Sequence, residues 1–90
     1  MLDIQYEKSF KKDYKRALRR GCNSALLEEV LDILIREEPL PPKYRDHALS
    51  GNYKGFRECH ITPDWLLIYK VLSNELVLLL IRTGSHSELF

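Results

Sequence analysis

Cysteine is scarce in this chain, and its scarcity excludes whole classes of protein. The two cysteines, Cys22 and Cys59, form no CxxC motif, so neither a disulfide scaffold nor a structural zinc site is expected. Long hydrophobic runs are also absent, since the longest, Leu76–Ile81, has six residues against the roughly 20 that span a bilayer. The first ten residues lack the apolar core of a secretory signal. We therefore expect a cytoplasmic protein with no membrane segment.

The charge is small in total but uneven along the chain. The length of 90 residues, of which 44% are hydrophobic and 30% charged, fits one globular domain over residues 1–90. The formal net charge is +1, yet residues 1–20 carry seven Lys or Arg against three acids, and residues 21–40 carry one Arg against five acids. Such asymmetry leaves room for a local nucleic-acid-binding surface despite the near-neutral sum.

Hydrophobic periodicity predicts a β-α-α-β-β-β order of elements. Residues 2–6 alternate like a short strand, and a helical period then runs over residues 8–21. A second helical stripe begins after a cap at Asn23 or Ser24 and ends before Pro39. Three strands are expected at Phe56–Ile61, Trp65–Leu72 and Glu75–Arg82. We predict an α+β fold in which a hairpin of one basic and one acidic helix packs on one face of a small antiparallel sheet.

Two features of this layout bear on function. The last predicted strand is apolar on both faces, so we place it centrally, with Arg82 continuing the face of Leu78 and Leu80. Two helices cover one face only, so the C-terminal segment or a partner must cover part of the other. The irregular segment 39–55 is longer than an ordinary connection, which favours a functional loop; it contains His47 and Lys54.

The histidines, whose imidazoles suit proton transfer near neutral pH, all lie in the second half of the chain. The three histidines are His47, His60 and His86. Alternation along the strand puts Glu58 on the same face as His60, and Asp64 follows just past the turn, where it could orient His60. A carboxylate and an imidazole on one strand face can act on one substrate.

A guanidinium joins this set where the last predicted strand ends. Gly84 permits a sharp change of direction that brings His86 back beside Arg82. Imidazoles, a carboxylate and a guanidinium suit cleavage of RNA by its own 2′-hydroxyl, which needs a base, an acid and a cation for the phosphoryl oxygens.

Plainer interpretations of the same residues remain open. His60 can be a structural histidine, Arg82 a salt-bridge partner and Glu58 a solvated surface group. The basic helix face can simply be solvated. Three histidines can also form a catalytic zinc site, but none lie at the i, i+4 spacing of helical metal motifs, and we expect no metal or other cofactor.

Four segments together carry a family resemblance that covers essentially the whole chain. They are Tyr44–Leu49, Lys54–Arg57, Pro63–Tyr69 and Arg82–Phe90, with His60 between the second and third. The chain resembles the YafQ branch of the RelE-like bacterial toxins. The resemblance implies the RelE-like fold and the toxin of a type II toxin–antitoxin system. Such toxins are mRNA interferases, endoribonucleases that cut messenger RNA on the translating ribosome without a metal and are silenced by an antitoxin that wraps them with helical segments.

The resemblance also implies a role for each candidate residue. His86 is the general acid, Arg82 clamps the phosphate and the transition state, and Phe90 positions or stacks on the substrate. The acid–base set is completed by His47, His60 and Asp64. Glu58 could be the general base, a role left open between it and the imidazoles of His47 and His60.

Substrate binding is expected from exposed basic residues. Lys54 lies in the functional loop, and the basic helix is predicted to grip ribosomal RNA phosphates through Lys11, Lys12, Lys15 and Arg19. The expected partners are an antitoxin, mRNA and the ribosome, with operator DNA contacted through the antitoxin complex. The alternative function is a non-catalytic nucleic-acid-binding module that represses its operator with an antitoxin partner.

Overall fold

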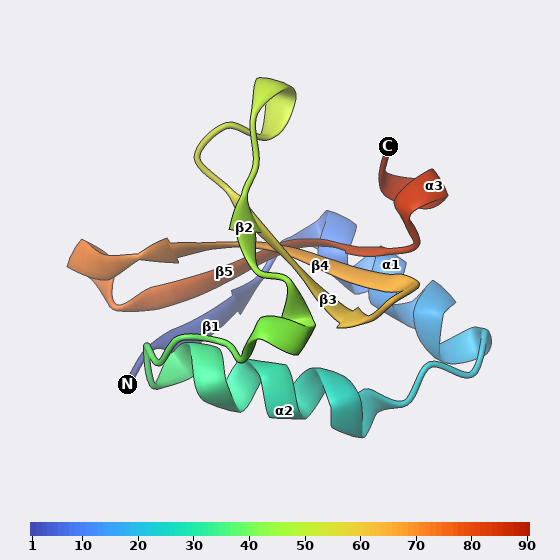
Figure 1. The fold of residues 1–90 in the computed structure, drawn as a ribbon, viewed down its shortest axis with the longest axis horizontal. Helices are drawn as coiled ribbons and strands as arrows, with labels where there is room; N and C mark the ends of the chain where they lie inside the picture. The colour runs from blue at the N-terminus through green and yellow to red at the C-terminus, as the bar shows by residue number, and fades with distance from the viewer.

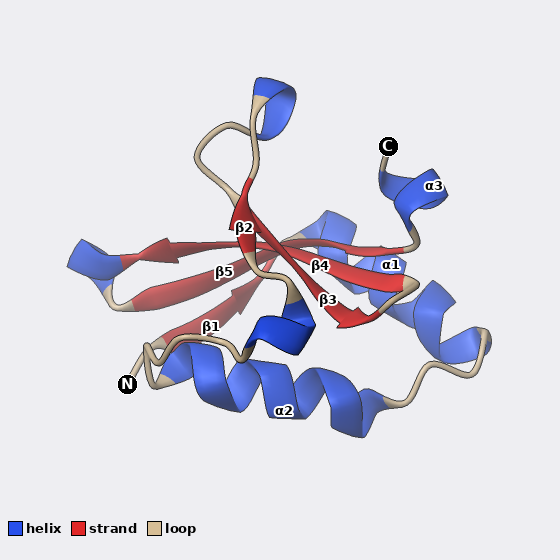
Figure 2. Cartoon of the chain, in the orientation of Figure 1, coloured by secondary structure: helices blue, strands red, loops and turns tan.

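A five-stranded sheet with the strand order β1-β5-β4-β3-β2 forms the centre of the computed structural model, which describes residues 1–90. The strands are β1 (Asp3–Tyr6), β2 (His47–Ala48), β3 (Arg57–Thr62), β4 (Trp65–Leu72) and β5 (Val77–Gly84). The helices are α1 (Lys8–Arg19), α2 (Ser24–Ile35) and α3 (His86–Leu89), with short 3-10 turns η1 (Pro42–Tyr44), η2 (Gly51–Tyr53) and η3 (Ser73–Glu75). Figure 1 shows this arrangement, and Figure 2 separates its helices and strands.

The strand pairing confirms the predicted meander and adds two features. β3, β4 and β5 pair antiparallel in succession, and β5 lies between β4 and β1, which confirms its central position. The sheet is mixed rather than purely antiparallel, because β1 pairs parallel to β5. The two-residue strand β2 pairs with β3, with His47 opposite Glu58. The functional loop therefore joins the sheet.

A local irregularity in β5 overturns the predicted position of Arg82. The strand runs over Val77–Gly84 rather than Glu75–Arg82. Tyr69 lies opposite Leu80 while Ile68 lies opposite Arg82, so one extra residue is inserted in β5 between these two pairs. A bulge of this kind reverses the alternation of faces. The prediction that Arg82 shares the face of Leu80 is wrong, since Leu80 packs under the helices and Ile68 belongs to the opposite face.

Both long helices pack on one face of the sheet, as predicted. The main hydrophobic core joins helical residues such as Phe10 and Val30 to sheet residues such as Leu67 and Leu78. The Asn23 side chain accepts a hydrogen bond from the backbone N–H of Ala25, which confirms the predicted helix cap. Figure 2 shows α2 running back from the end of α1. No helix has the length and apolar character needed to cross a membrane.

The second face of the sheet is covered only in part. Leu89 of α3 packs on Leu66 and Ile68, and partly buried residues surround them: Leu49, Tyr53, Phe56 and Ile81. Figure 1 shows α3 and the loop around η2 rising from the side of the sheet opposite α2. The C-terminal segment thus supplies part of the expected cover. The uncovered part of this face carries the candidate site.

Candidate active site

A buried carboxylate lies between two imidazoles on the second face of the sheet. Oε1 of Glu58 is 3.4 Å from Nε2 of His47 and 3.8 Å from Nε2 of His60. The Glu58 side chain is 6% exposed, whereas His47 is 48% and His60 22% exposed. The carboxylate therefore lies beneath the rings, and the imidazoles are the more exposed groups of the cluster.

Backbone geometry sets the orientation of the His47 ring. Its Nδ1 lies 2.7 Å from the carbonyl oxygen of Arg45. A carbonyl only accepts, so Nδ1 carries a proton and Nε2 is the nitrogen that turns toward Glu58. Arg45 has a φ of 48°, in the left-handed region that non-glycine residues rarely adopt. This strained residue directs its carbonyl at the ring, as is common at functional sites.

The neighbouring Asp46 anchors the start of β2 on the other face of the sheet. Its carboxylate accepts hydrogen bonds from Nη2 of Arg57 at 2.8 Å and from the Tyr69 hydroxyl at 2.5 Å. Burial, followed by the hydrogen bond to Asp46, raises the pKa of the Tyr69 phenol. The hydrogen bond to Asp46 likewise raises the pKa of Arg57. These contacts hold the backbone that presents His47.

The second oxygen of Glu58 is an exception to normal hydrogen bonding. Oε2 is buried and has no hydrogen-bond partner. Leaving a buried polar atom unpaired costs about 1–3 kcal/mol. A fold that retains such a group against its own stability usually does so for function.

Arg82, at the end of β5, is held by an acid that the sequence analysis missed. Its Nε and Nη2 donate to the two carboxylate oxygens of Asp13 at 2.5 and 3.2 Å. These hydrogen bonds are the main reason that the pKa of Arg82 is raised. A pattern could have revealed Asp13, because it lies three residues after Phe10 and four before Ala17, on the buried stripe of an otherwise basic helix.

His86 begins α3, which a capping box stabilises. The backbone N–H of Ser85 donates to Oε1 of Glu88 at 2.8 Å, and the backbone N–H of Glu88 donates to Oγ of Ser85 at 3.3 Å. Glu88 also forms ion pairs with Arg16 at 2.9 Å and with Arg20. The hydrogen bonds from Ser85, helped by these two cations, lower the pKa of Glu88. The helix that carries His86 is therefore tied to α1.

An aromatic bridge connects α3 with the loop around η2. The ring of Phe90 lies 5.1 Å from the His86 ring and 5.7 Å from the Tyr53 ring, measured between centroids. Tyr53 also makes an edge contact with Phe56 at 6.3 Å. The sequence analysis did not single out Tyr53, although an aromatic residue beside the Lys54-Gly55 motif is a usable signal. The predicted Phe90 lies beside His86, and 56% of it is exposed.

Other predicted residues stand apart from this cluster. Asp64 is exposed in the turn between β3 and β4, and the carboxylate near His60 is that of Glu58, so the structure does not bring Asp64 to His60. Lys54 is exposed beyond η2. The helical residues Lys11, Lys12, Lys15 and Arg19 are all exposed. They form no ion pair, whereas Arg16 and Arg20 of the same helix are bound to acids.

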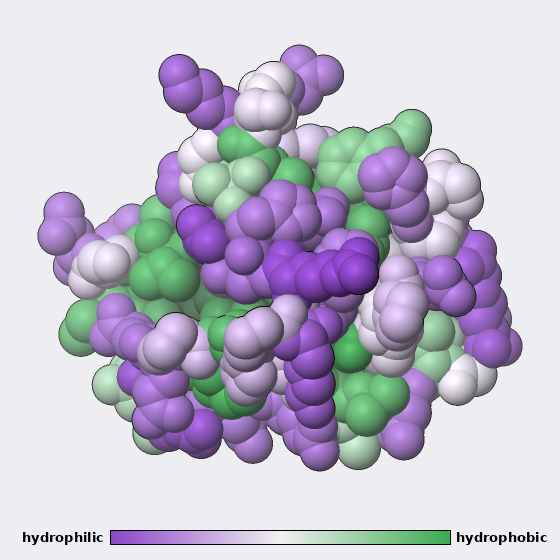
Figure 3. Space-filling model, in the orientation of Figure 1, coloured by the Kyte–Doolittle hydropathy of each residue, from purple (hydrophilic) through white to green (hydrophobic).

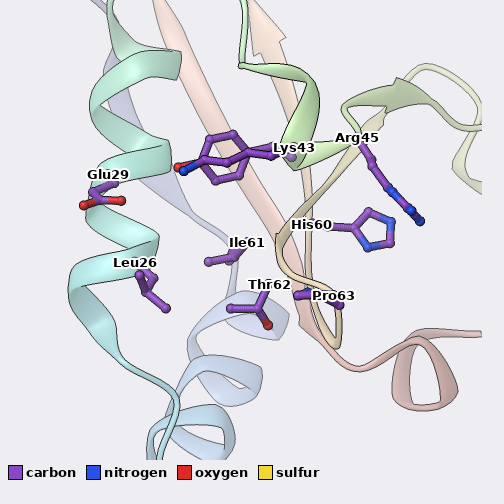
Figure 4. Close-up of a pocket in the computed structure, with 9 residues that line it drawn as sticks. Leu26, Glu29, Lys43, Arg45, His60, Ile61, Thr62 and Pro63 are labelled. Carbon is purple, nitrogen blue, oxygen red and sulfur yellow. The ribbon is translucent and has the colours of Figure 1, made fainter.

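A cavity of about 550 Å³ opens beside His60. Figure 4 shows Leu26 and Glu29 of α2 on one side of it, and Arg45 and His60, which point the same way, on the other. Lys43 lies with its Nζ 5.0 Å from the centre of the Tyr44 ring. Neither Lys43 nor Arg45 forms an ion pair, and Figure 4 shows Arg45 on the side of His60 while Lys43 extends toward α2.

The fold and the site together define a small toxin of the RelE-like class. Residues 2–90 match the family described as the bacterial toxin of type II toxin-antitoxin system, YafQ. The chain belongs to this family. It is 42% identical over 89 residues to the mRNA interferase toxin YafQ of Escherichia coli K12, an alignment that covers 98% of this chain and 95% of that one. It is 36% identical to a putative toxin YafQ of Haemophilus influenzae, covering 97% and 90%.

Solved structures agree with this assignment and confirm the predicted fold. A metal-bound toxin from Helicobacter pylori has 50% identity and a TM-score of 0.94, with both chains fully covered. YafQ from E. coli BL21(DE3) has 41% identity and a TM-score of 0.90, covering 100% of this chain and 99% of that one. YafQ in the E. coli DinJ–YafQ complex has 42% identity and a TM-score of 0.88 with the same coverage.

Proposed function

We propose that this toxin is an mRNA interferase that cleaves ribosome-bound mRNA by acid–base catalysis, with no metal in the reaction. The observation that carries the proposal is that Glu58, His47 and His60 lie together on the uncovered sheet face. Arg82 at the end of β5 and the helix α3, which carries His86, lie on the same face. The name of the E. coli relatives, mRNA interferase toxin, supports it. The side chains themselves provide the base, the acid and the cation that the reaction needs.

The cleavage divides its proton transfers between two groups of residues. His47 or His60 accepts the proton of the 2′-hydroxyl, the 2′-oxygen attacks phosphorus, and the bond from phosphorus to the 5′-oxygen breaks. His86 donates a proton to that leaving oxygen. Arg82 stabilises the charge on the phosphoryl oxygens. Because Glu58 is nearly inaccessible, it orients the imidazoles rather than acting as the base.

RNA on either side of the cleaved bond is expected to follow the hydrophilic surface. Figure 3 shows strongly hydrophilic side chains gathered across the middle of this view, over η1 and β3. The cavity beside His60 suits one nucleotide, with Arg45 on its phosphate. Phe90 stacks on a base, as aromatic residues of RNA-binding sites do. Lys54, which is exposed beyond η2, contributes a further cation for the RNA strand.

A modified message tests the chemistry. With a 2′-deoxynucleotide on the 5′ side of the cleaved bond, cleavage there is expected to stop, because the attacking oxygen is missing. The unmodified message is expected to give a 2′,3′-cyclic phosphate end. Both messages are translated with chelator-treated toxin, and the ends are identified by mass spectrometry. Cleavage of the deoxy message, or a 3′-hydroxyl end, contradicts the proposal and favours metal-assisted hydrolysis.

Ribosome binding is assigned to the unpaired cations of α1. Replacing Lys11, Lys12, Lys15 and Arg19 with Gln is expected to weaken ribosome co-sedimentation and reduce the slope of log affinity against log salt by about 3. The fold remains intact because these side chains are exposed and unpaired. The control is Arg36→Gln, at an exposed residue whose ion pair with Glu38 lies at the end of α2. Unchanged ribosome binding and translation inhibition in the fourfold variant disprove the role.

The inhibitory partner is an antitoxin, as the E. coli DinJ–YafQ complexes suggest for this chain. Its helical segments wrap the toxin, and the complex contacts operator DNA. The alternative function, operator repression without catalysis, depends on the basic helix and tolerates loss of His86 and Arg82. Repression that survives in a His86→Ala variant while cleavage stops separates the two functions.

A further inference from the structure

We infer that α1 positions the catalytic end of β5, with Asp13 holding Arg82 in place to stabilise the transition state. Through Arg16 and Glu88, the same helix holds α3 and its His86. This inference rests on the proposed function, because it assigns positioning roles around the residues that the proposal makes catalytic. None of the three positioning residues touches the substrate.

Helix α1 replaces a strand along the catalytic end of β5. The parallel partner β1 ends at Tyr6, which lies opposite Leu80. Beyond that point the edge of β5 is bound by α1, since Oγ of Ser9 donates to the Ile81 carbonyl at 2.7 Å. The backbone N–H of Thr83 donates to Asp13 at 3.2 Å. Asp13 thus fixes both the backbone and the side chain at the end of the strand.

Asp13 holds the Arg82 guanidinium in place but leaves some of its N–H groups free for a substrate. Asp13 is 5% exposed, and its two oxygens accept from Nε and Nη2 of Arg82. A guanidinium has five N–H donors, so three remain for phosphoryl oxygens. A guanidinium that is held along one edge loses little conformational freedom when the transition state forms. Such pre-orientation accelerates reactions.

A chain of alternating charges connects this clamp with the general acid. Arg16 donates to Asp13 at 3.1 Å through Nη2, and its Nε lies 2.9 Å from Oε2 of Glu88. Glu88 in turn binds Arg20 and caps the backbone of Ser85. Arg16 is therefore the link between the positions of Arg82 and His86.

Gly84 makes the close approach of these elements possible. Its φ is 155°, and a Cβ on this residue would lie 3.0 Å from Oε1 of Glu88 and 3.5 Å from the Leu89 side chain. Any larger residue pushes Glu88 away from the strand end. The turn between Arg82 and His86 is thus built around the Glu88 carboxylate.

A double-mutant cycle tests whether Asp13 acts through Arg82. The Asp13→Asn, Arg82→Gln and double variants are compared with the unmodified toxin for kcat and KM of mRNA cleavage. We expect Asp13→Asn to lower kcat about 10²-fold with little change in KM. In the Arg82→Gln background, Asp13→Asn should lower kcat no further. The matched control is Asp3→Asn, at an exposed acid of β1, which should change neither constant.

If the losses of kcat from Asp13→Asn and Arg82→Gln add in the double variant, Asp13 serves the fold alone. That result overturns the inference but leaves the proposed function standing. A normal kcat in Arg82→Gln overturns both. If Asp13→Asn does not fold, the cycle is made with Arg16→Gln and Glu88→Gln, which cut the link to α3. Each single change should then lower kcat severalfold, and the double variant should have a kcat no lower than that of either single variant. Additive losses there overturn the role of α1.

Discussion

Replacing His86 with Ala is expected to lower the rate of mRNA cleavage by about 10²–10⁴-fold, the usual contribution of a general acid. The exposed imidazole leads α3 but is not part of its capping box or its ion pairs, so the fold should persist. The rate is measured by single-turnover cleavage of mRNA on purified ribosomes. In cells, expression without antitoxin should permit growth, whereas the unmodified toxin should arrest it.

The matched control for this change lies one residue further along α3. Ser87 is exposed, and its hydroxyl contacts only that of Ser85, so Ser87→Ala should retain full toxicity. The His86→Ala variant should also bind the antitoxin normally, which shows that it is folded. Equal growth arrest by His86→Ala and the unmodified toxin would mean that His86 is not the acid.

Replacing Glu58 with Gln is expected to make the protein more stable and less active at once. The buried Oε2 has no hydrogen-bond partner in the native toxin, and a neutral amide costs less to bury than a carboxylate. A gain of about 1 kcal/mol raises the melting temperature by about 4–8 °C in a domain of this size. The rate should fall about 10²-fold, because an amide no longer offers the carboxylate that orients the rings of His47 and His60.

The stability and the cleavage rate of the Glu58→Gln variant are measured on the same preparation, by thermal unfolding and by single-turnover cleavage. Glu75→Gln is the control, since this acid is exposed in η3, at the opposite end of β5 from Arg82. It should leave the rate unchanged. A Glu58→Gln variant that is less stable and fully active contradicts the positioning role and shows that the carboxylate serves the fold.

Periodicity is sufficient to predict the order of the two long helices and of the strands other than β2, and part of the site, but it reveals neither β2 nor α3. The apolar stripes of the two helices and the alternation of β3 are local patterns, and alternation by itself places Glu58 and His60 on one strand face. The cap at Asn23 follows from the same local chemistry. The hydrogen bond between Arg82 and Asp13 of α1 leaves no such local pattern in the sequence, since the two residues lie 69 positions apart.

The missed features have identifiable physical reasons. Val77–Ile81 is apolar at every position, so alternation cannot reveal the bulge that turns Arg82 to the other face. Strand β2 has two residues, too few for any period, yet it places His47 against Glu58. Asp64 is near His60 in sequence, but the turn between β3 and β4 leaves it exposed and apart from the imidazole.

The long separation between Asp13 and Arg82 makes catalysis dependent on cooperative folding of the whole domain. The acid comes from the first helix and the guanidinium from the last strand, so their contact closes a loop of 69 residues. Contacts of such high sequence separation form late and slowly. A partly folded chain therefore has no complete active centre, and the onset of toxicity during folding should report the final docking of α1 on β5.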